Sequence, residues 1–596
     1  MVTKRVSQYI IDCLVHNGID TFFLVTGGAI VPTVDYIGTK SEAKYYCFQH
    51  EQSAAMAAEA YYRTTGKIGV VLSTSGPGAQ NLLNGICGCW YESIPCLFLT
   101  GQVSTYESID SIIANPRQLG FQEMPVVESF KSFTKFSKKV TVESIDQDLE
   151  LAFLNCIQDR PGPCLLDLPV DVQTAETSKE LITFKSKLST CKSGLSYDIT
   201  EIQTQLDQSK RPLLLLGHGI RLADAVDEIR SLVDKLNIPF VVSWGGFDLI
   251  EHTHPNFIGT IGVYGSRGGN FAVQNCDLLI SIGSRLDTRQ TGGNLKTFSR
   301  NSYKVVVDID YSELEKGKGR GLDIDLAINC DALVFINESL NTLKQPKLNT
   351  EWQLQCNKWK NLNLDTRELK EDVLTSYEFL EYLDTKLNDD AIIIPDEGGH
   401  LVWSMQSLKA KSKQRIFSNF GNSSMGYSLP AAIGAAVDTN KQVVCIDGDG
   451  GFQMNIQELQ TIKNYNLPVK IFIINNGCYG IIKQFQDAYF SSRYIASNRG
   501  DYSVPDFVKI ATAYGIESLE ATKQNYKQVV ESALSSTSAV LVNVIIDREQ
   551  KLTPKLEFGN PLEDMSPYLT TEEIKQNMIV DMIPRLDRKG WVTIKK

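Results

Sequence analysis

The sequence lacks a basic excess and long apolar runs. Its 59 Lys and Arg residues stand against 70 Asp and Glu residues, which gives a formal net charge of −11. Because phosphate backbones are bound by basic surfaces, this balance argues against a nucleic-acid partner. No apolar run approaches membrane-spanning length, and the N-terminus has no apolar core of a secretory signal. We therefore expect a cytoplasmic protein with no membrane partner.

The sequence also lacks paired cysteine motifs. Its 13 cysteines form no CxxC pair and show no regular spacing. We therefore expect buried free thiols, which suit a reducing compartment.

The order of apolar segments predicts several α/β domains. A chain of 596 residues is too long for one hydrophobic core. Apolar strands alternate with amphipathic helices in three segments, which polar stretches at 173–197 and 345–368 separate. This alternation is typical of parallel sheets. We predict three doubly wound parallel-sheet domains, followed by a tail, at residues 1–172, 198–344, 369–549 and 550–596.

The most informative motif is Gly448-Asp449-Gly450-Gly451, followed one helix-length segment later by Asn475-Asn476. Each follows an apolar run, at 443–446 and 471–474, so the segment is typical of one βαβ unit. The carboxyl ends of its two strands would bring Asp449 and Asn476 to one point. Carboxylate and amide oxygens beside glycines suit a Mg²⁺ ion that holds a diphosphate. The alternative is a glycine-rich turn of an ordinary doubly wound sheet.

These motifs resemble the diphosphate anchor of thiamine-diphosphate enzymes. Further motifs come in the order and spacing of the acetolactate synthase branch, a resemblance that spans residues 1–550: Thr26-Gly27-Gly28, His50-Glu51-Gln52, Ser75-Gly76-Pro77-Gly78-Ala79-Gln80-Asn81 and Thr100-Gly101-Gln102. The resemblance implies pyrimidine-binding, central and diphosphate-binding domains. It also implies a homodimer or homotetramer, because the family's active site lies between the first domain of one subunit and the third domain of another.

The resemblance assigns a catalytic role to Glu51. Taken alone, this glutamate is explained by the charge preference of a first helical turn. In the family, the matching carboxyl group hydrogen-bonds the aminopyrimidine ring and is kept partly protonated by burial. Phe121, Gln122 and Lys135 would approach the 2-oxo acid, although Lys135 is equally explained as a solvated lysine.

The resemblance also assigns cofactor and metal contacts. The Mg²⁺ ligands would be Asp449, Asn476 and the main-chain carbonyl of Cys478. For Met425, the alternative to supporting the cofactor is ordinary core packing. The remaining expected thiamine-diphosphate contacts are Gly28, Pro77, Gly78, Asn81, Gly399, His400, Gly450, Gly451, Tyr479 and Ile481.

The acceptor pocket departs from the family pattern. Ile481, Ile482 and Phe485 would form its wall, but acetolactate synthases carry Met-Val where Ile481-Ile482 stand and tryptophan where Phe485 stands. These departures leave the cofactor chemistry intact and put the acceptor in doubt.

The middle segment resembles the flavin-holding domain of acetolactate synthases. Gly217-His218-Gly219 is an incomplete dinucleotide fingerprint. The runs 283–289 and 305–310 follow the order of that central domain, which holds FAD in a structural role, and Arg289 is a candidate FAD contact. Central domains of this type also persist without flavin. A nicotinamide-dependent dehydrogenase is disfavoured, because Glu51 and Asp449 would then have no role.

The function implied is decarboxylation of a 2-oxo acid, pyruvate foremost, with transfer of the acyl unit to a second carbonyl compound. The run 561–567 resembles thiamine-diphosphate proteins of bacterial surface-sugar pathways, some of which use a keto-sugar nucleotide as acceptor. The alternatives are an acetolactate synthase of branched-chain amino-acid biosynthesis, which Phe485 weighs against, and a diketone lyase or hydrolase. A non-enzymatic scaffold is disfavoured by intact Glu51, Asp449 and Asn476.

Overall fold

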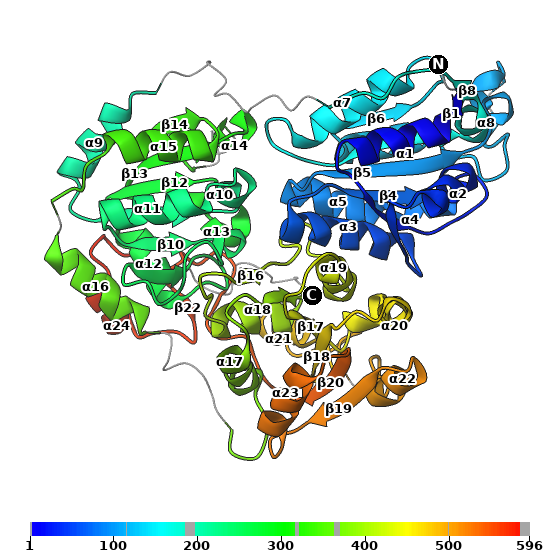
Figure 1. The fold of residues 1–596 in the computed structure, drawn as a ribbon. Coiled ribbons are helices and arrows are strands. Elements are labelled where there is room, and N and C mark those ends of the chain that lie inside the picture. The colour runs from blue at the N-terminus through cyan, green and yellow to red at the C-terminus, as the bar shows by residue number, and fades with distance from the viewer. Residues whose placement is uncertain are drawn as a thin grey trace.

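The computed structural model describes residues 3–114, 116–184, 197–315, 321–347, 349–362, 370–498 and 500–583. Three lobes follow one another along the chain, coloured blue to cyan, green, and yellow to orange in Figure 1. Each lobe is built on a six-stranded sheet in which every pair of neighbouring strands is parallel. The predicted α/β class with three parallel-sheet domains is therefore confirmed.

The N-terminal lobe has the strand order β3-β2-β4-β5-β7-β6. Its strands are β2 (Thr21–Leu24), β3 (Lys44–Cys47), β4 (Gly69–Ser73), β5 (Cys96–Gln102), β6 (Phe136–Lys139) and β7 (Cys164–Pro169). Its helices are α1 (Val6–His16), α2 (Val31–Thr39), α3 (Glu51–Thr65), α4 (Pro77–Asn81), α5 (Leu83–Glu92), α6 (Val126–Phe130), α7 (Ile145–Ile157) and α8 (Val170–Thr174). The short strands β1 (Lys4–Arg5) and β8 (Glu176–Thr177) pair antiparallel beside this sheet.

The C-terminal lobe has the order β16-β15-β17-β18-β20-β19, which repeats that of the N-terminal lobe strand for strand. Its strands are β15 (Ile392–Pro395), β16 (Arg415–Ile416), β17 (Val443–Gly448), β18 (Lys470–Asn475), β19 (Glu517–Ala521) and β20 (Val540–Ile545). Its helices are α17 (Ser376–Lys386), α18 (Gly399–Ser407), α19 (Ser428–Ala436), α20 (Leu459–Tyr465), α21 (Gly480–Tyr489), α22 (Phe507–Ala513) and α23 (Tyr526–Ser535).

The central lobe is wound differently, in the order β11-β10-β9-β12-β13-β14. This is the 3-2-1-4-5-6 order of dinucleotide-binding folds, in which the chain changes direction between β9 and β12. Its strands are β9 (Pro212–Leu216), β10 (Phe240–Val242), β11 (Phe257–Thr260), β12 (Leu278–Ile282), β13 (Tyr303–Asp308) and β14 (Leu326–Asn329). Its helices are α9 (Ile199–Gln208), α10 (Gly219–Leu222), α11 (Val226–Leu236), α12 (Arg267–Asn275), α13 (Thr288–Thr291), α14 (Tyr311–Glu315), α15 (Ala332–Thr342) and α16 (Thr350–Lys360).

Both faces of each sheet are buried, which explains the continuous apolar runs in the sequence. In β17, Cys445 faces one core while Val444 and Ile446 face another. The same alternation holds in β2, where Phe23 and its neighbour Phe22 belong to different cores. Parallel strands covered by helices on both sides need apolar residues at every position.

Helices α3 and α19 join the N-terminal lobe to the C-terminal lobe. They occupy equivalent places, each between the second and third strands of its lobe along the chain. Their alanines and Gly434 permit close approach: a Cβ added at Gly434 would lie 1.9 Å from the Ala57 carbonyl oxygen. Helix α3 ends at Gly66, whose φ of 73° is left-handed. One apolar core therefore spans both lobes.

The predicted tail, residues 550–596, is described as far as residue 583. It contains β21 (Lys555–Leu556), β22 (Met565–Ser566) and α24 (Thr571–Asn577), and it lies against the central lobe (Figure 1, red). Gln274 of α12 donates to Glu563, and Trp359 of α16 donates to Asn577 at 2.9 Å. Among the described residues, every helix is too short or too polar to cross a membrane.

Candidate active site

A cavity of 260 Å³ lies at the carboxyl ends of β15, β17 and β18 in the C-terminal lobe. Among the described residues, those that line it come from the C-terminal and central lobes. Many residues predicted to bind the cofactor or metal lie together in this wall, as does Ile482 of the predicted acceptor pocket: Gly399, His400, Met425, Asp449, Gly450, Gly451, Asn476, Cys478, Tyr479 and Ile481.

Three of these residues bring polar groups to one point. The side-chain amide of Asn476 ends 2.7 Å from the Cys478 carbonyl oxygen and 3.3 Å from Asp449 Oδ2. With its nitrogen in that position the amide donates to both oxygens. A divalent cation between them would instead take the amide oxygen, so a 180° turn of one amide converts the cluster into three oxygen ligands. This donor set fits Mg²⁺.

Asp449 is held in place for such a role. Its side chain is buried, with Oδ1 accepting from the Tyr502 hydroxyl at 2.8 Å and Oδ2 accepting from the Gly477 N–H at 2.6 Å. Burial raises the pKa of the Asp449 carboxyl, while the bonds from Tyr502 and Gly477 lower it. A nearby cation would favour the charged form further.

The floor of the cavity is the backbone of the glycine motif. A Cβ added at Gly450 would lie 2.3 Å from Tyr479 Cε1, and one added at Gly448 would lie 2.5 Å from His400 Nδ1. Only glycine permits these close approaches. The main chain at 448–451 lines the cavity. Bare backbone beside a cation site fits a diphosphate.

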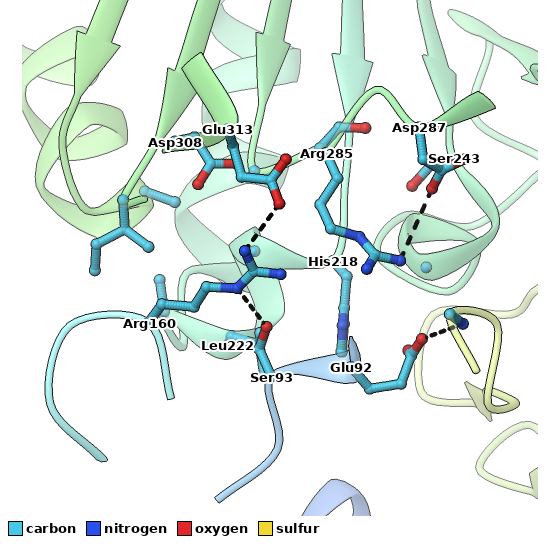
Figure 2. A pocket seen from close by; sticks show the side chains of 18 of the residues that line it. Glu92, Ser93, Arg160, His218, Leu222, Ser243, Arg285, Asp287, Asp308 and Glu313 are labelled. Carbon is cyan, nitrogen blue, oxygen red and sulfur yellow. Dashed lines mark hydrogen bonds and ion pairs between the residues drawn. The ribbon is translucent and has the colours of Figure 1, made fainter. Parts of the chain in front are cut away.

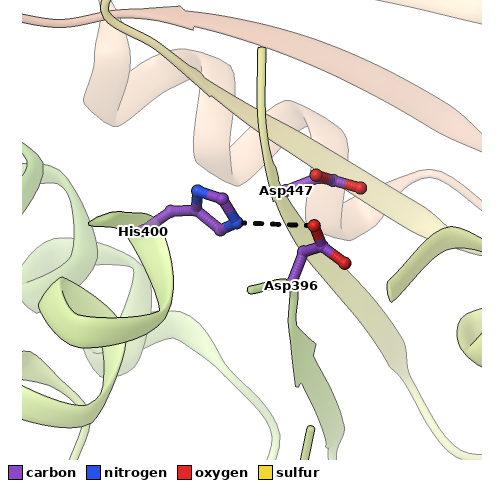
Figure 3. Close-up of side chains that lie close together, drawn as sticks. All are labelled: Asp396, His400 and Asp447. Atoms are coloured by element: carbon purple, nitrogen blue, oxygen red, sulfur yellow. Dashed lines mark ion pairs between the residues drawn. The ribbon is translucent and has the colours of Figure 1, made fainter. Parts of the chain in front are cut away.

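Asp396, His400 and Asp447 form a buried group behind this floor (Figure 3). They are close enough together to hold a metal ion, but the carboxylates already have partners. Asp396 accepts from the backbone N–H groups of Gly426 and Ser428, both at 2.9 Å. Asp447 accepts from the Ser428 hydroxyl at 2.8 Å, and burial together with Asp396 raises its pKa. The group fixes the turn that carries Met425 into the cavity wall.

A second cluster of predicted residues lies at the carboxyl ends of β3 and β4 in the N-terminal lobe. Glu51, the first residue of α3, is 8% exposed, and its Oε2 accepts from Asn81 Nδ2 at 2.9 Å. A Cβ at Gly78 would lie 3.2 Å from Glu51 Oε1, and one at Gly76 would lie 2.8 Å from the Gln122 carbonyl oxygen. This chain does not place Glu51 in the wall of the 260 Å³ cavity.

Four further predicted residues do not line the cavity, and one of them, Lys135, directly precedes β6 at the amino end of the N-terminal sheet. Gly28 follows β2 and is exposed, as is Phe121, with 86% of its surface accessible. Lys135 Nζ donates to the Gln158 carbonyl at 2.5 Å. Phe485 packs against Tyr489 and Phe558, outside the residues that line the cavity.

A larger cavity of 680 Å³ lies where the three lobes meet. It is at the carboxyl ends of β9, β12, β13 and β14, and therefore at the point where the central sheet changes winding direction. A Cβ at Gly217 would lie 2.2 Å from the Gly283 carbonyl oxygen, so the two turns above β9 and β12 approach closely. Figure 2 shows Arg160 reaching Glu313 and Ser93, and Arg285 beside Asp287.

Arg289 lies between the two cavities and lines both of them, as do Trp244, Tyr264 and Ser423. The predicted flavin contact therefore also faces the smaller cavity. Glu397 lines the smaller cavity and Tyr502 holds Asp449, although neither was predicted as a site residue. Glu397 has one sequence signal, its place between the end of β15 and the Gly398-Gly399 turn; Tyr502 has none.

Family models match the chain in three consecutive parts. Residues 4–129 match the N-terminal TPP binding domain of thiamine pyrophosphate enzymes, residues 199–339 match the central domain, and residues 396–544 match the C-terminal TPP binding domain. The chain belongs to the thiamine pyrophosphate enzyme family.

Within this family the chain is similar to acetolactate synthases. It is 32% identical to the acetolactate synthase isozyme 2 large subunit of Escherichia coli K12, over 95% of this chain and all of that protein. It is 35% identical to the acetolactate synthase large subunit of Pyropia yezoensis, over 92% of this chain and 93% of that protein. The probable acetolactate synthase large subunit of Methanocaldococcus jannaschii is 31% identical, over 96% of each chain. This thiamine pyrophosphate enzyme is therefore related to acetolactate synthase.

Proposed function

We propose that the protein decarboxylates pyruvate and transfers the acetyl unit to a second carbonyl compound, with thiamine diphosphate and Mg²⁺ as cofactors. The observation that carries this proposal is the convergence of Asp449, Asn476 and the Cys478 carbonyl beside the glycine floor. When bound, thiamine diphosphate supplies a carbon nucleophile that adds to a ketone and accepts electrons as carbon dioxide leaves.

Residues of the C-terminal lobe would bind and orient this cofactor. Asp449, Asn476 and Cys478 would hold Mg²⁺, and the backbone at 448–451 would face the diphosphate. Met425 and Ile481 are the apolar side chains of the wall that would support the organic part of the cofactor. Apolar walls exclude water, which strengthens every electrostatic contact inside the cavity.

Glu51 would hold and pass a proton. Asn81 fixes Oε2 by a hydrogen bond, while Oε1 lies beside Gly78. A buried carboxyl at a helix start can exchange a proton with a bound ring nitrogen. Gln122, whose backbone lies against Gly76, would be close enough to contact the substrate.

A second copy of the chain would complete each site. Glu51 and Asp449 line different clusters of one chain, so a homodimer or homotetramer would join the N-terminal lobe of one subunit to the C-terminal lobe of another. Phe121, next to Gln122, is 86% exposed in the single chain and would be covered in such an interface.

The larger cavity is our candidate site for FAD. Its volume of 680 Å³, its place at the winding change and the close turns at Gly217 and Gly283 fit a dinucleotide. Arg285 and Arg289 would face its phosphates or flavin ring.

The acceptor we favour is a keto-sugar nucleotide, as in surface-sugar pathways. Phe485 is turned into a cluster with Tyr489 and Phe558, which leaves Ile482, 48% exposed, at the cavity rim. Because the Phe485 ring is not part of the cavity wall, the rim at Ile482 gives room for an acceptor bulkier than a 2-oxo acid. The similarity to acetolactate synthases supports a second candidate, in which a 2-oxo acid is the acceptor.

The test is carbon dioxide release from pyruvate with thiamine diphosphate and Mg²⁺, with products identified by mass spectrometry. The assay is run with and without a 4-keto-deoxysugar nucleotide, and with EDTA as the control. A branched sugar with little acetolactate supports the favoured acceptor, and efficient acetolactate formation from pyruvate alone supports the second candidate. Absence of pyruvate consumption in both assays would contradict the proposal and favour a diketone lyase.

A further inference from the structure

An Arg–Glu pair stands in the wall of the smaller cavity. Arg289 comes from α13 of the central lobe and lines both cavities, whereas Glu397 comes from the turn after β15 and lines the smaller one. Arg289 Nη1 lies 3.9 Å from Glu397 Oε2, and only 4% of the Glu397 side chain is exposed. The two charges therefore meet where the central lobe closes the cofactor cavity.

Arg289 and Glu397 do not satisfy each other's hydrogen-bonding groups. A separation of 3.9 Å is too long for a direct hydrogen bond. Arg289 Nη1 is buried and has no hydrogen-bond partner among the described residues, and the guanidinium lies 5.2 Å from the centre of the Trp244 ring. Glu397 Oε2 accepts from the Ser423 hydroxyl at 2.8 Å. A ligand hydroxyl placed beside the pair can accept from Arg289 and donate to Glu397 at the same time.

The net charge of Arg289 and Glu397 affects how strongly the cavity binds an acceptor that carries a carboxylate. A lone guanidinium in a cavity wall attracts a carboxylate, because it offers two parallel donors and a positive charge. Here the Glu397 carboxylate offsets that charge. Burial raises the pKa of Glu397 to about 7, while Arg289 and Ser423 lower it and the nearby Asp396 and Glu92 raise it. The pair therefore presents less positive charge to an acceptor than Arg289 would alone.

We propose that Glu397 is a specificity-determining residue, which pairs with Arg289 so that the cavity disfavours a negatively charged acceptor and favours one whose reacting end is an uncharged, hydroxylated carbonyl. This inference rests on the proposed function, because it concerns the acceptor of that same reaction. It explains how a chain similar to acetolactate synthases would use a sugar-like acceptor in preference to a second 2-oxo acid.

The experiment compares three acceptors that differ in one feature at a time. Propanal is the reference, D-glyceraldehyde adds two hydroxyl groups to it, and 2-oxobutyrate adds a carboxylate at the carbonyl carbon. The full chain with thiamine diphosphate and Mg²⁺ receives labelled pyruvate and pairs of acceptors in competition. Product ratios are measured by mass spectrometry, and carbon dioxide release is followed in the same samples.

For the unchanged protein we expect D-glyceraldehyde to be preferred to propanal, and propanal to 2-oxobutyrate. Glu397→Gln keeps the size and removes the charge, and should raise the 2-oxobutyrate to propanal product ratio at least tenfold. Arg289→Gln should lower the D-glyceraldehyde preference, and it is the second variant if Glu397→Gln does not fold. When Arg289 is already replaced by glutamine, Glu397→Gln should change the 2-oxobutyrate to propanal product ratio less than threefold. The guanidinium that would attract the carboxylate is then absent.

Two results would overturn the inference alone: an unchanged product ratio in Glu397→Gln, or an equal change with and without Arg289. Carbon dioxide release from pyruvate in the unchanged protein separates these results from a failure of the proposed function. A protein that releases no carbon dioxide from pyruvate would overturn the function and this inference together.

Discussion

The N-terminal and C-terminal lobes share one strand order but hold different chemistry. Both sheets bring the carboxyl ends of their parallel strands to one edge, and both place a helix, α3 or α19, between the second and third strands along the chain. At that edge the N-terminal lobe carries a carboxyl and amide side chain, Glu51 and Asn81, held 2.9 Å apart. The C-terminal lobe carries the oxygen cluster around Asp449. Topology fixes where a site lies, and the loop residues decide what it can do.

The largest expected effect tests the N-terminal site alone. Glu51→Gln keeps the hydrogen-bonding shape but removes the exchangeable acid, so we expect turnover to fall by roughly 10²–10⁴-fold. Binding of thiamine diphosphate, measured by calorimetry, should change little, because glutamine keeps a hydrogen-bonding group at this position and the C-terminal lobe would hold the diphosphate and Mg²⁺. The control is Glu42→Gln, at an exposed turn. Near-normal turnover of Glu51→Gln would contradict the role of Glu51 in proton transfer. It would also contradict the assignment of different functions to the two lobes.

The next effect tests the C-terminal site. Loss of a residue that merely supports a metal ligand weakens binding by about 10–100-fold, so Asp449→Ala should weaken Mg²⁺-dependent binding of thiamine diphosphate by more than about 100-fold. Calorimetric titration with and without EDTA measures this. Asp389→Ala, at a side chain that is 87% exposed, is the control. Unchanged cofactor affinity would exclude Asp449 from the metal site.

The smallest expected effect tests the junction that both lobes share. In Gly434→Ala the new methyl group would meet the Ala57 carbonyl, and overpacking of this kind costs about 1–3 kcal/mol. We expect the thermal midpoint to fall by several degrees in differential scanning calorimetry, with activity lost in proportion to unfolding.

The same substitution at a second glycine, Gly38, should change stability in the opposite direction. A Cβ at Gly38, exposed in α2, meets nothing within 4 Å. Gly38→Ala should therefore raise stability by about 0.4–1 kcal/mol, because it restricts the unfolded chain without a clash. Equal behaviour of the two variants would contradict the close packing of α3 on α19.

Local motifs made much of the fold and of the cofactor cavity predictable. The apolar runs before Gly448 and Asn475 form β17 and β18, and the residues that follow them line one cavity. This succeeds because a parallel strand has one carboxyl end, and neighbouring strands share that edge. The Ala-rich pattern after Glu51 likewise forms α3, since small residues permit helix–helix contact.

Contacts between distant segments were not predictable in this way. Tyr502 reaches Asp449 from far along the chain, and Arg289 of the central lobe reaches Glu397 of the C-terminal lobe. Phe485 was expected in the wall of the acceptor pocket, yet it lies on α21 and packs against Phe558 of the tail. Periodicity specifies which face of an element is apolar, but not which other element covers it.

The sequence by itself determined the family, the three parallel sheets and the loops that carry the site residues, because strand order along the chain and glycine-rich turns are local properties. The tertiary structure decided the rest. It separated Glu51 from Asp449 into two clusters of one chain, turned Phe485 toward the tail, and set Glu397 against Arg289 in a shared wall. These arrangements depend on how the lobes pack, since burial and pairing of charges arise only when segments far apart in sequence meet.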